Sequence, residues 1–390
     1  MRNKFSLSFF YALIAIFTFF TFSCSKKVNS VSSDFSEIKS STHKWYYFSQ
    51  NEFLQIEKPQ KAPFIPAKPY TESVRISSAS SQMQNQENEY SAPKGFALVN
   101  RVGMLIFDNE EIDFVKDATF FTDKTASNLV FYNETPVFSV YKSSFFNNSE
   151  RKNTENLNPF LVQLNLNQKV FFPILNVENL GLDSNCEITD FVWDGQYWTC
   201  SVKKTDASKT DFSFLTFQVK KDLLLLSPTS AQKELFIQQT DSQAFRTSRK
   251  IESYKHSPQR IQEILKSVQK KDELFLKVYT AGSHSPRYFS NQKNQNENKL
   301  NATCLLSDIF SAVLFEDGSF YINGALYEKN IFNQGKTCAM KFPKLPAGYV
   351  YSDFAITGTY LYAAWEESAF FKTGKSGFIQ IDLNKVLANF

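Results

Sequence analysis

The sequence is poor in the residues that support metal, redox and nucleophilic chemistry. Its 390 residues include 3 His, 5 Cys and 12 Gly. There is no Cys-x-x-Cys, which argues against a zinc knuckle or a thioredoxin-type site, and no Gly-x-Ser-x-Gly, His-Glu-x-x-His or EF-hand loop. The histidines lie far apart in polar stretches, and we interpret each as a solvated loop residue: His43, His256 and His284. We therefore expect no metal ion and no cofactor.

Charge of one sign is also scarce. The formal net charge is +4, and removal of Arg2 and Lys4 with an export segment would lower it by two, to +2. No run of five basic residues occurs. Because nucleic-acid binding needs clustered Lys and Arg to neutralise phosphates, we expect no nucleic-acid partner.

Aromatic and apolar residues are abundant by contrast. Aromatics make up 16% of the chain, with 41 Phe, and hydrophobic residues 42%. Phe and Tyr suit a pleated, half-buried surface, so the composition favours strands over helices. Short apolar or alternating runs bounded by turn residues recur along the chain, typical of sandwiches, barrels and propellers: 95–99, 103–107, 129–132, 137–141, 160–164 and 170–172. The sequence therefore predicts an all-β fold.

The N-terminus carries an export signal. A short basic start, Met1–Lys4, precedes an uncharged apolar run from Phe5 to Ser23. Such a run is a signal peptide or a single membrane helix. Ser23-Cys24 then offers a small residue before Cys, and the Ser-rich stretch that follows has too little apolar surface to pack. We predict a signal peptide over 1–23, lipid attachment at Cys24 and a tether over 24–44.

The first two dozen residues resemble a bacterial lipoprotein signal. They depart from the usual box, which has Leu three residues before the Cys and a small residue two before it, where this chain has Thr21 and Phe22. Looser boxes of this kind resemble those of spirochaetal lipoproteins. The alternative is an uncleaved anchor helix with an incidental Cys. Either way, the body is expected to be exported and held at a membrane, on the periplasmic side or at the cell surface.

Four cysteines remain after Cys24. An exported protein can form disulfides, and four Cys allow three pairings: Cys186, Cys200, Cys304 and Cys338. A hairpin folded at Asp194-Gly195 would place Cys200 opposite Thr189 instead of Cys186. Buried free thiols are the competing interpretation, since free Cys is among the most buried residue types.

The chain also matches itself. Residues 188–198 lie over 351–361 without a gap, so that Asp190, Phe191, Gly195 and Tyr197 match Asp353, Phe354, Gly358 and Tyr360. With one inserted residue, 214–219 then match 378–383. A fainter copy includes Asp308 and Gly318. The recurring Asp suggests a structural hydrogen bond to the backbone more than a catalytic carboxylate.

The spacing of the turn glycines suggests propeller blades. Gly195, Gly318 and Gly358 are separated by 318 − 195 = 123 and 358 − 318 = 40 residues, and a period of about 41 is typical of four-stranded blades. We predict a β-propeller-like body over 45–390, with about seven four-stranded blades. Two polar loops, 77–93 and 284–300, interrupt it, and a short helical insertion is expected at about 257–271.

These features together resemble a spirochaetal, treponemal-type membrane lipoprotein with a propeller-like body. The resemblance implies no activity. We expect a binding or assembly scaffold of the cell envelope, held to the membrane by its N-terminal lipid, with an envelope protein or glycan as partner and no catalysis. The alternative is an extracytoplasmic propeller enzyme that hydrolyses glycans or peptides with channel carboxylates.

Overall fold

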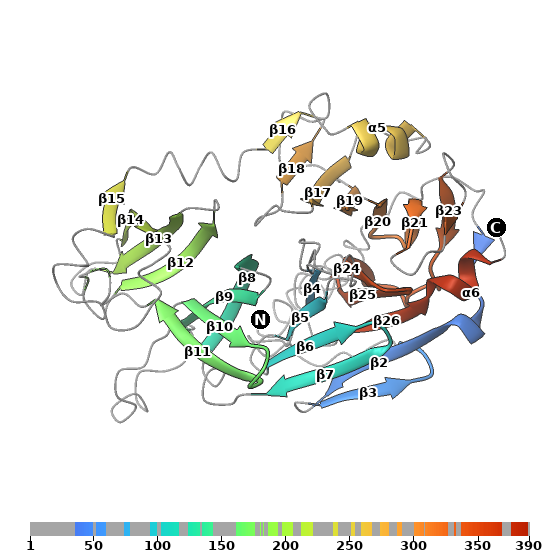
Figure 1. Ribbon diagram of the computed structural model, residues 1–390, viewed down its shortest axis with the longest axis horizontal. Coiled ribbons are helices and arrows are strands. Elements are labelled where there is room, and N and C mark those ends of the chain that lie inside the picture. The colour runs from blue at the N-terminus through green and yellow to red at the C-terminus, as the bar shows by residue number, and fades with distance from the viewer. Residues whose placement is uncertain are drawn as a thin grey trace, which may run out of the picture.

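The computed structural model shows a β-rich chain with few helices (Figure 1). It describes these residues: 36–49, 52–59, 74–78, 94–99, 103–116, 124–132, 135–142, 161–175, 180, 182, 186–193, 197–205, 212–220, 237–240, 251–253, 259–266, 274–280, 287–290, 300–307, 309–326, 331–332, 337–368 and 376–388. The predicted signal peptide and Cys24 lie outside these ranges. The all-β prediction is confirmed.

Three sheets are four-stranded antiparallel meanders. The first contains β4 (Val74–Ser78), β5 (Gly95–Val99), β6 (Gly103–Asp108) and β7 (Glu111–Lys116). The second contains β8 (Lys124–Tyr132), β9 (Thr135–Lys142), β10 (Leu161–Asn165) and β11 (Val170–Leu175). The third contains β12 (Cys186–Trp193), β13 (Tyr197–Thr205), β14 (Phe212–Lys220) and β15 (Ile237–Thr240). The strands predicted from short apolar runs all fall within the first two sheets.

A five-stranded sheet joins the two ends of the chain. Its order is β24-β25-β26-β2-β3, and its strands are β24 (Tyr349–Thr357), β25 (Tyr360–Glu367), β26 (Ser376–Asp382), β2 (His43–Ser49) and β3 (Glu52–Ile56). β2 pairs antiparallel with β26, so the N-terminal strand completes the C-terminal meander. Helix α6 (Leu383–Leu387) follows β26 and is capped by Asp382, whose Oδ1 accepts from the Lys385 backbone N–H at 3.2 Å.

The remaining sheet has nine strands, which departs from the predicted four-stranded blades. Its path is β1-β23-β21-β20-β19-β17-β18-β16, with β22 paired to β21. The strands are β1 (Ser36–Glu37), β16 (Ile251–Ser253), β17 (Leu274–Thr280), β18 (Arg287–Ser290), β19 (Leu300–Leu306), β20 (Phe310–Phe315), β21 (Ser319–Ala325), β22 (Ile331–Phe332) and β23 (Cys338–Lys341). The sheet is this wide because β17 pairs with β19 in parallel. This pairing joins β16, β17 and β18 to the antiparallel strands that start at β19.

Three predicted boundaries need correction. β1 and the 3₁₀ turn η1 (Ser40–Thr42) lie inside the predicted tether and β1 pairs with β23, so the described part of the body already includes Ser36, ahead of the predicted start at Trp45. β18 lies inside the predicted loop 284–300, and β4 extends to Ser78, inside the predicted loop 77–93. The predicted short helix is present as α5 (Gln259–Lys266), with Ile261 and Leu265 buried against the nine-stranded sheet, and the rest of the predicted range lies outside the described residues.

Neighbouring sheets pack face to face in series. On β5, Phe96 and Leu98 belong to the core shared with the β8–β11 sheet, and Ala97 and Val99 to the core shared with the five-stranded sheet. Successive strand residues point to opposite faces, so this sheet is apolar on both. Further cores join the β8–β11 sheet to the β12–β15 sheet and the five-stranded sheet to the nine-stranded one. Among the described residues, no core cluster joins the β12–β15 sheet to the nine-stranded sheet.

The two self-similar segments share one strand register. Phe191 pairs with Cys200 as Phe354 pairs with Ala363, and each hairpin has a register shift just before this pair, between Ile188 and Asp190 in one and between Tyr351 and Phe354 in the other. The third strand corrects the sequence alignment: Trp198 pairs with Val219 and Leu361 with Ile381. The offset there is 381 − 219 = 162, against 361 − 198 = 163 for the hairpin, so the later copy is one residue shorter and not one longer. The predicted alignment of the third strand is therefore wrong by two residues. Because side chains alternate between the two faces of a strand, a shift of two keeps each residue on the face that was predicted for it.

Candidate functional site

A pocket lies at the seam between the five-stranded and nine-stranded sheets. Its volume is about 180 Å³. β17 and β19 contribute from one sheet, with the turn after β20, and β24 and β25 from the other. The residues that line this seam pocket are Phe275, Lys277, Asn301, Ala302, Thr303, Glu316, Tyr351, Ser352, Asp353 and Glu366.

An ion pair between the two sheets forms part of its lining. Lys277 Nζ lies 2.8 Å from Asp353 Oδ1, with 22% of the lysine side chain and 9% of the aspartate side chain exposed. Thr303 Oγ1 donates to the Ser352 carbonyl at 3.1 Å and lies 3.5 Å from Asp353 Oδ1. Lys277 Nζ also sits 4.9 Å from the centroid of the Tyr279 ring, a favourable cation–π geometry. The pair therefore has support on several sides.

Local sequence explains how both side chains reach the pocket. On β17, Leu274, Leu276 and Val278 are buried in the core under α5, so the period of two sends Lys277 to the other face. On β24, the pairing jumps from Tyr351–Trp365 to Phe354–Ala363, which leaves Ser352 and Asp353 in a bulge. Bulges re-aim side chains and are common beside functional sites.

The environment holds Lys277 in its charged form. Burial lowers the pKa of an ammonium, but attraction by the Asp353 carboxylate, with a smaller contribution from Tyr279, outweighs it and raises the pKa of Lys277 above its ordinary value. Burial raises the pKa of Tyr279 to about 12, against the opposing effect of Lys277. Lys277 is thus a poor general base at neutral pH, since it does not release its proton there.

Two further carboxylates line the pocket. Glu316 accepts from the Asn301 side-chain amide, and its backbone carbonyl accepts from the Tyr351 N–H at 3.0 Å. Glu366 belongs to β25. Among the described lining residues, the charged groups are Lys277 and the carboxylates of Asp353, Glu316 and Glu366.

Some hydrogen-bonding capacity in the pocket is unused. Within the described residues, Asp353 Oδ1 receives Lys277 and Thr303, and Oδ2 has no hydrogen-bond donor. The buried Ser352 Oγ also has no partner there. Buried polar groups are rarely left unpaired, so each such group needs an explanation such as a ligand.

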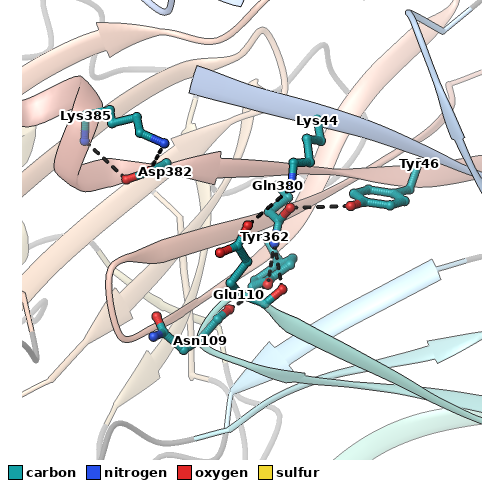
Figure 2. Close-up of polar contacts among 8 residues, drawn as sticks. All are labelled: Lys44, Tyr46, Asn109, Glu110, Tyr362, Gln380, Asp382 and Lys385. Atoms are coloured by element: carbon teal, nitrogen blue, oxygen red, sulfur yellow. Dashed lines mark hydrogen bonds and ion pairs between the residues drawn. The ribbon is translucent and has the colours of Figure 1, made fainter. Parts of the chain in front are cut away.

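A second polar cluster lies where the five-stranded sheet meets the β6–β7 turn. We call it the clasp: Tyr46, Asn109, Thr357, Tyr362 and Gln380, of which all but Thr357 are drawn in Figure 2. The Asn109 backbone N–H donates to Thr357 Oγ1 at 3.0 Å, and Tyr362 Oη donates to the Asn109 carbonyl at 2.6 Å. Gly358, with φ +56°, makes this approach possible, because a Cβ there would lie 2.4 Å from Asn109 Oδ1.

The amide of Gln380 is the hub of the clasp. Its Nε2 donates to Tyr362 Oη at 2.8 Å and to the Glu110 carbonyl at 3.0 Å, and its Oε1 lies 3.4 Å from Tyr46 Oη (Figure 2). Burial raises the pKa of Tyr362 well above its ordinary value. At the surface above, Lys44 Nζ pairs with Glu110 Oε1 at 3.2 Å, both side chains being about half exposed. The partners saturate one another, so the clasp holds sheets together and offers little to a ligand.

The site residues considered from the sequence have mixed outcomes. Cys24, His256 and His284 lie outside the described residues. His43 opens strand β2 and its Nδ1 lies 3.0 Å from the Lys39 carbonyl, which corrects its prediction as a loop residue. In the described part of the chain, no group of His, Cys, Asp and Glu is arranged to hold a metal ion.

The cysteines that can be judged are free thiols. Cys200, Cys304 and Cys338 are buried and unbridged, and burial raises the pKa of Cys304 strongly. Cys200 pairs with Phe191, and Cys186 with Lys204. The prediction that Cys200 does not lie opposite Cys186 is therefore confirmed. Its expected partner Thr189 was wrong by two residues, because Trp193 pairs with Trp198 and so places Phe191 opposite Cys200.

The seam pocket itself was not predicted. The sequence predicts a structural hydrogen bond from the recurring Asp353 to the backbone, whereas the described contacts of its side chain are with the side chains of Lys277 and Thr303. No local motif marks Glu316 or Glu366. The sequence signal that could have indicated the pocket is Lys277, a charged residue between the apolar residues of β17.

Comparisons with known proteins agree with the lipoprotein resemblance and add no activity. A family model described as a family of unknown function (DUF8086) matches residues 35–385. An uncharacterized lipoprotein of Treponema pallidum (strain Nichols) is 22% identical over 403 residues, covering 87% of each chain. The crystal structure of polysaccharide lyase Uly1 matches over 80% of this chain and 78% of that one, with a TM-score of 0.25 and 8% identity. Likeness at that level supports no argument about activity. Within the described ranges, none of the helices has the length and apolar character needed to cross a membrane.

Proposed function

The chain belongs to the DUF8086 family, and we propose that it is an exported, lipid-anchored binding protein of the cell envelope. The export signal and Ser23-Cys24 support the anchor, as does similarity to a treponemal lipoprotein. The observation that carries the binding role is the seam pocket, which is lined by a supported ion pair and in which the buried Ser352 Oγ has no hydrogen-bond partner among the described residues. Its partner would be an envelope protein, a glycan or a smaller envelope molecule.

The same proposal extends to the body as a propeller-type platform. Four core clusters link the five sheets in series, and the last meander is completed by the N-terminal strand β2. Joining the two chain ends in one sheet is how a ring of blades would be held shut. Limited proteolysis tests this: cleavage within β2 should lower the melting temperature of the whole body. Unfolding of the five-stranded sheet alone would contradict it.

Lipid attachment has a direct test. Intact-mass analysis of membrane-extracted protein should show a chain that begins at Cys24 and carries added acyl mass. A Cys24→Ala variant should leave the membrane fraction. An unprocessed chain that starts at Met1 would contradict the proposal and favour the anchor helix.

Binding is tested with detergent-solubilised full-length protein. Envelope extracts and defined small molecules should raise the melting temperature of the wild type, and this shift should shrink in Glu316→Gln and Glu366→Gln. Two carboxylates in one pocket also suit glycoside hydrolysis, which makes a hydrolase the second candidate. Turnover of a glycan or peptide that is abolished by either Gln substitution would favour the hydrolase.

A further inference from the structure

The floor of the seam pocket is built by two parallel strands in register. β17 and β19 pair Phe275 with Asn301 and Lys277 with Thr303, and all four residues line the pocket. The residues that alternate with them on both strands are buried in the core under α5. Because successive side chains point to opposite faces of a strand, the floor presents an aromatic ring beside a charged head and two polar groups.

The ion pair at this floor keeps hydrogen-bonding capacity on both of its members. Lys277 Nζ donates to Asp353 Oδ1 at 2.8 Å and lies against the Tyr279 ring. Since an ammonium has three N–H donors, at least one is left for a ligand. In the described part of the chain, Asp353 Oδ2 receives no hydrogen bond, although only 9% of that side chain is exposed. The pair thus places an available donor next to an available acceptor.

Ser352 adds a group that can both donate and accept. It stands beside Asp353 in the bulge of β24, and its buried Oγ has no hydrogen-bond partner among the described residues. Leaving a buried hydroxyl unpaired is unfavourable, and rotation about one side-chain bond is enough to turn it toward a ligand. The site therefore has a third polar atom to complete.

This set of groups favours a neutral ligand that carries hydroxyls. Each hydroxyl both donates and accepts, so two adjacent hydroxyls match the donor of Lys277 and the acceptor of Asp353 at once. A neutral ligand makes these contacts while the ion pair stays closed. An anion would compete with Asp353 for the lysine, and a cation would compete with Lys277 for the aspartate, and separating a buried pair is costly.

The size of the pocket suits a single six-membered ring. An engineered protein cavity of about 150 Å³ holds benzene, and the seam pocket has about 180 Å³. Phe275 offers apolar surface to the C–H groups of such a ring. The 22% exposure of the Lys277 side chain shows that the pocket reaches solvent, so a longer chain can extend outward from the bound ring.

We infer that the seam pocket binds one neutral pyranose sugar through a pair of adjacent hydroxyls. This inference rests on the proposed binding function and names the class of its ligand. Two sources share that chemistry: a free hexose and the terminal residue of a glycan chain.

The test is a ligand-observed NMR titration of the full-length protein in a detergent without a sugar head group. The probes are D-glucose, D-galactose and D-mannose, which differ in the arrangement of adjacent hydroxyls, each as the free sugar and as the terminal residue of a tetrasaccharide. Tetrahydropyran, the same ring without hydroxyls, is the ligand control. We expect at least one hexose to bind with a Kd on the order of 1 mM and tetrahydropyran not to bind.

Variants separate binding from folding. Ser352→Ala should weaken hexose binding by about tenfold without lowering the urea midpoint, because its hydroxyl has no described partner to lose. The double variant Lys277→Met, Asp353→Leu removes the donor and the acceptor together and should abolish binding while the protein stays folded. Ser41→Ala, which removes an exposed hydroxyl from η1, is the matched control and should bind like the wild type.

The outcomes distinguish the inference from the function on which it rests. Binding of a tetrasaccharide alone would support the inference with a glycan chain as source, and binding of a free hexose would support it with a free sugar. Hexose binding that persists in the double variant would place the sugar elsewhere and overturn the inference. Absence of binding by every hexose would also overturn it. The proposed binding function would then stand if envelope extracts still raised the melting temperature, and would fall with the inference if they did not.

Discussion

The clasp and the seam pocket are two polar clusters on the same five-stranded sheet, and they differ in how completely their atoms are paired. In the clasp, Gln380 contacts Tyr46, Tyr362 and the Glu110 carbonyl, and Tyr362 donates onward to Asn109. The clasp carries no buried charge. The seam pocket carries a buried ion pair and, among the described residues, two polar atoms without a hydrogen-bond partner: Ser352 Oγ and Asp353 Oδ2.

This difference distinguishes a structural network from the proposed binding site. Fully satisfied polar networks make a packing arrangement unique, whereas a partly satisfied one is costly unless something completes it. Both clusters join segments that are distant in sequence, so position alone does not separate them. The two clusters are separated by counting which donors and acceptors have a partner.

The largest expected effect is on the ion pair. Asp353→Leu leaves the Lys277 charge without its partner and should lower the free energy of unfolding by about 3 kcal/mol, the low end for a buried pair, because Lys277 keeps 22% of its side-chain exposure. Urea denaturation followed by tryptophan fluorescence at pH 7 measures it.

The double variant Lys277→Met, Asp353→Leu shows whether the loss comes from the stranded charge. Replacing both members of a buried pair with apolar residues is often neutral, so most of the stability should return. A double variant as unstable as Asp353→Leu would mean that Asp353 acts mainly through the bulge of β24.

A substitution in the clasp should lower the free energy of unfolding by less than the loss of the ion pair does. Because the clasp holds no charged pair, no second substitution of a charged residue should restore that stability. Gln380→Leu leaves Tyr362 Oη and the Glu110 carbonyl without their amide donor, and should cost about 2 kcal/mol in the same measurement. Glu110→Gln is the control: it removes the exposed pair with Lys44 and keeps the backbone carbonyl, so no measurable change is expected. Equal losses from the two variants would contradict the role assigned to Gln380.

Alkaline pH should produce the smallest differences. The raised pKa of Lys277 means that its stabilisation is complete below its unfolded value of 10.5 and is lost as pH rises through the folded value. Tyr279 stays protonated in the folded state up to about pH 12, whereas it ionises near 10.0 when unfolded, so folding also becomes less favourable above pH 10. Stability should therefore fall from pH 10 upward.

Single variants assign that alkaline loss to each cluster. Tyr279→Phe should make the free energy of unfolding fall less steeply between pH 10 and 12, by a slope that corresponds to at most one proton. Tyr362→Phe should have the same effect through the clasp. Urea midpoints at pH 8 to 12 report both. An unchanged slope in Tyr279→Phe would show that Tyr279 ionises in the folded state as it does in water.

Much of the sheet architecture could be predicted from local sequence. The alternation and turn residues around β5 and β6, β8 and β9, and β10 and β11 located these strands, because side-chain period and turn chemistry act over a few residues. The match between Asp190-Phe191 and Asp353-Phe354 located two hairpins with the same register. Composition alone indicated the all-β class.

Only the tertiary structure decided which distant strands pair and which polar residues meet. The parallel pairing of β17 with β19 widened one sheet beyond a predicted blade, and β2 joined β26 across nearly the whole chain. Lys277 and Asp353 are 76 residues apart, and each looks like an ordinary polar residue in its own strand. Hydrophobic burial is non-directional, so local pattern shows that a strand must be covered but not by which sheet. The packing of two sheets made that choice and brought the residues of the seam pocket together.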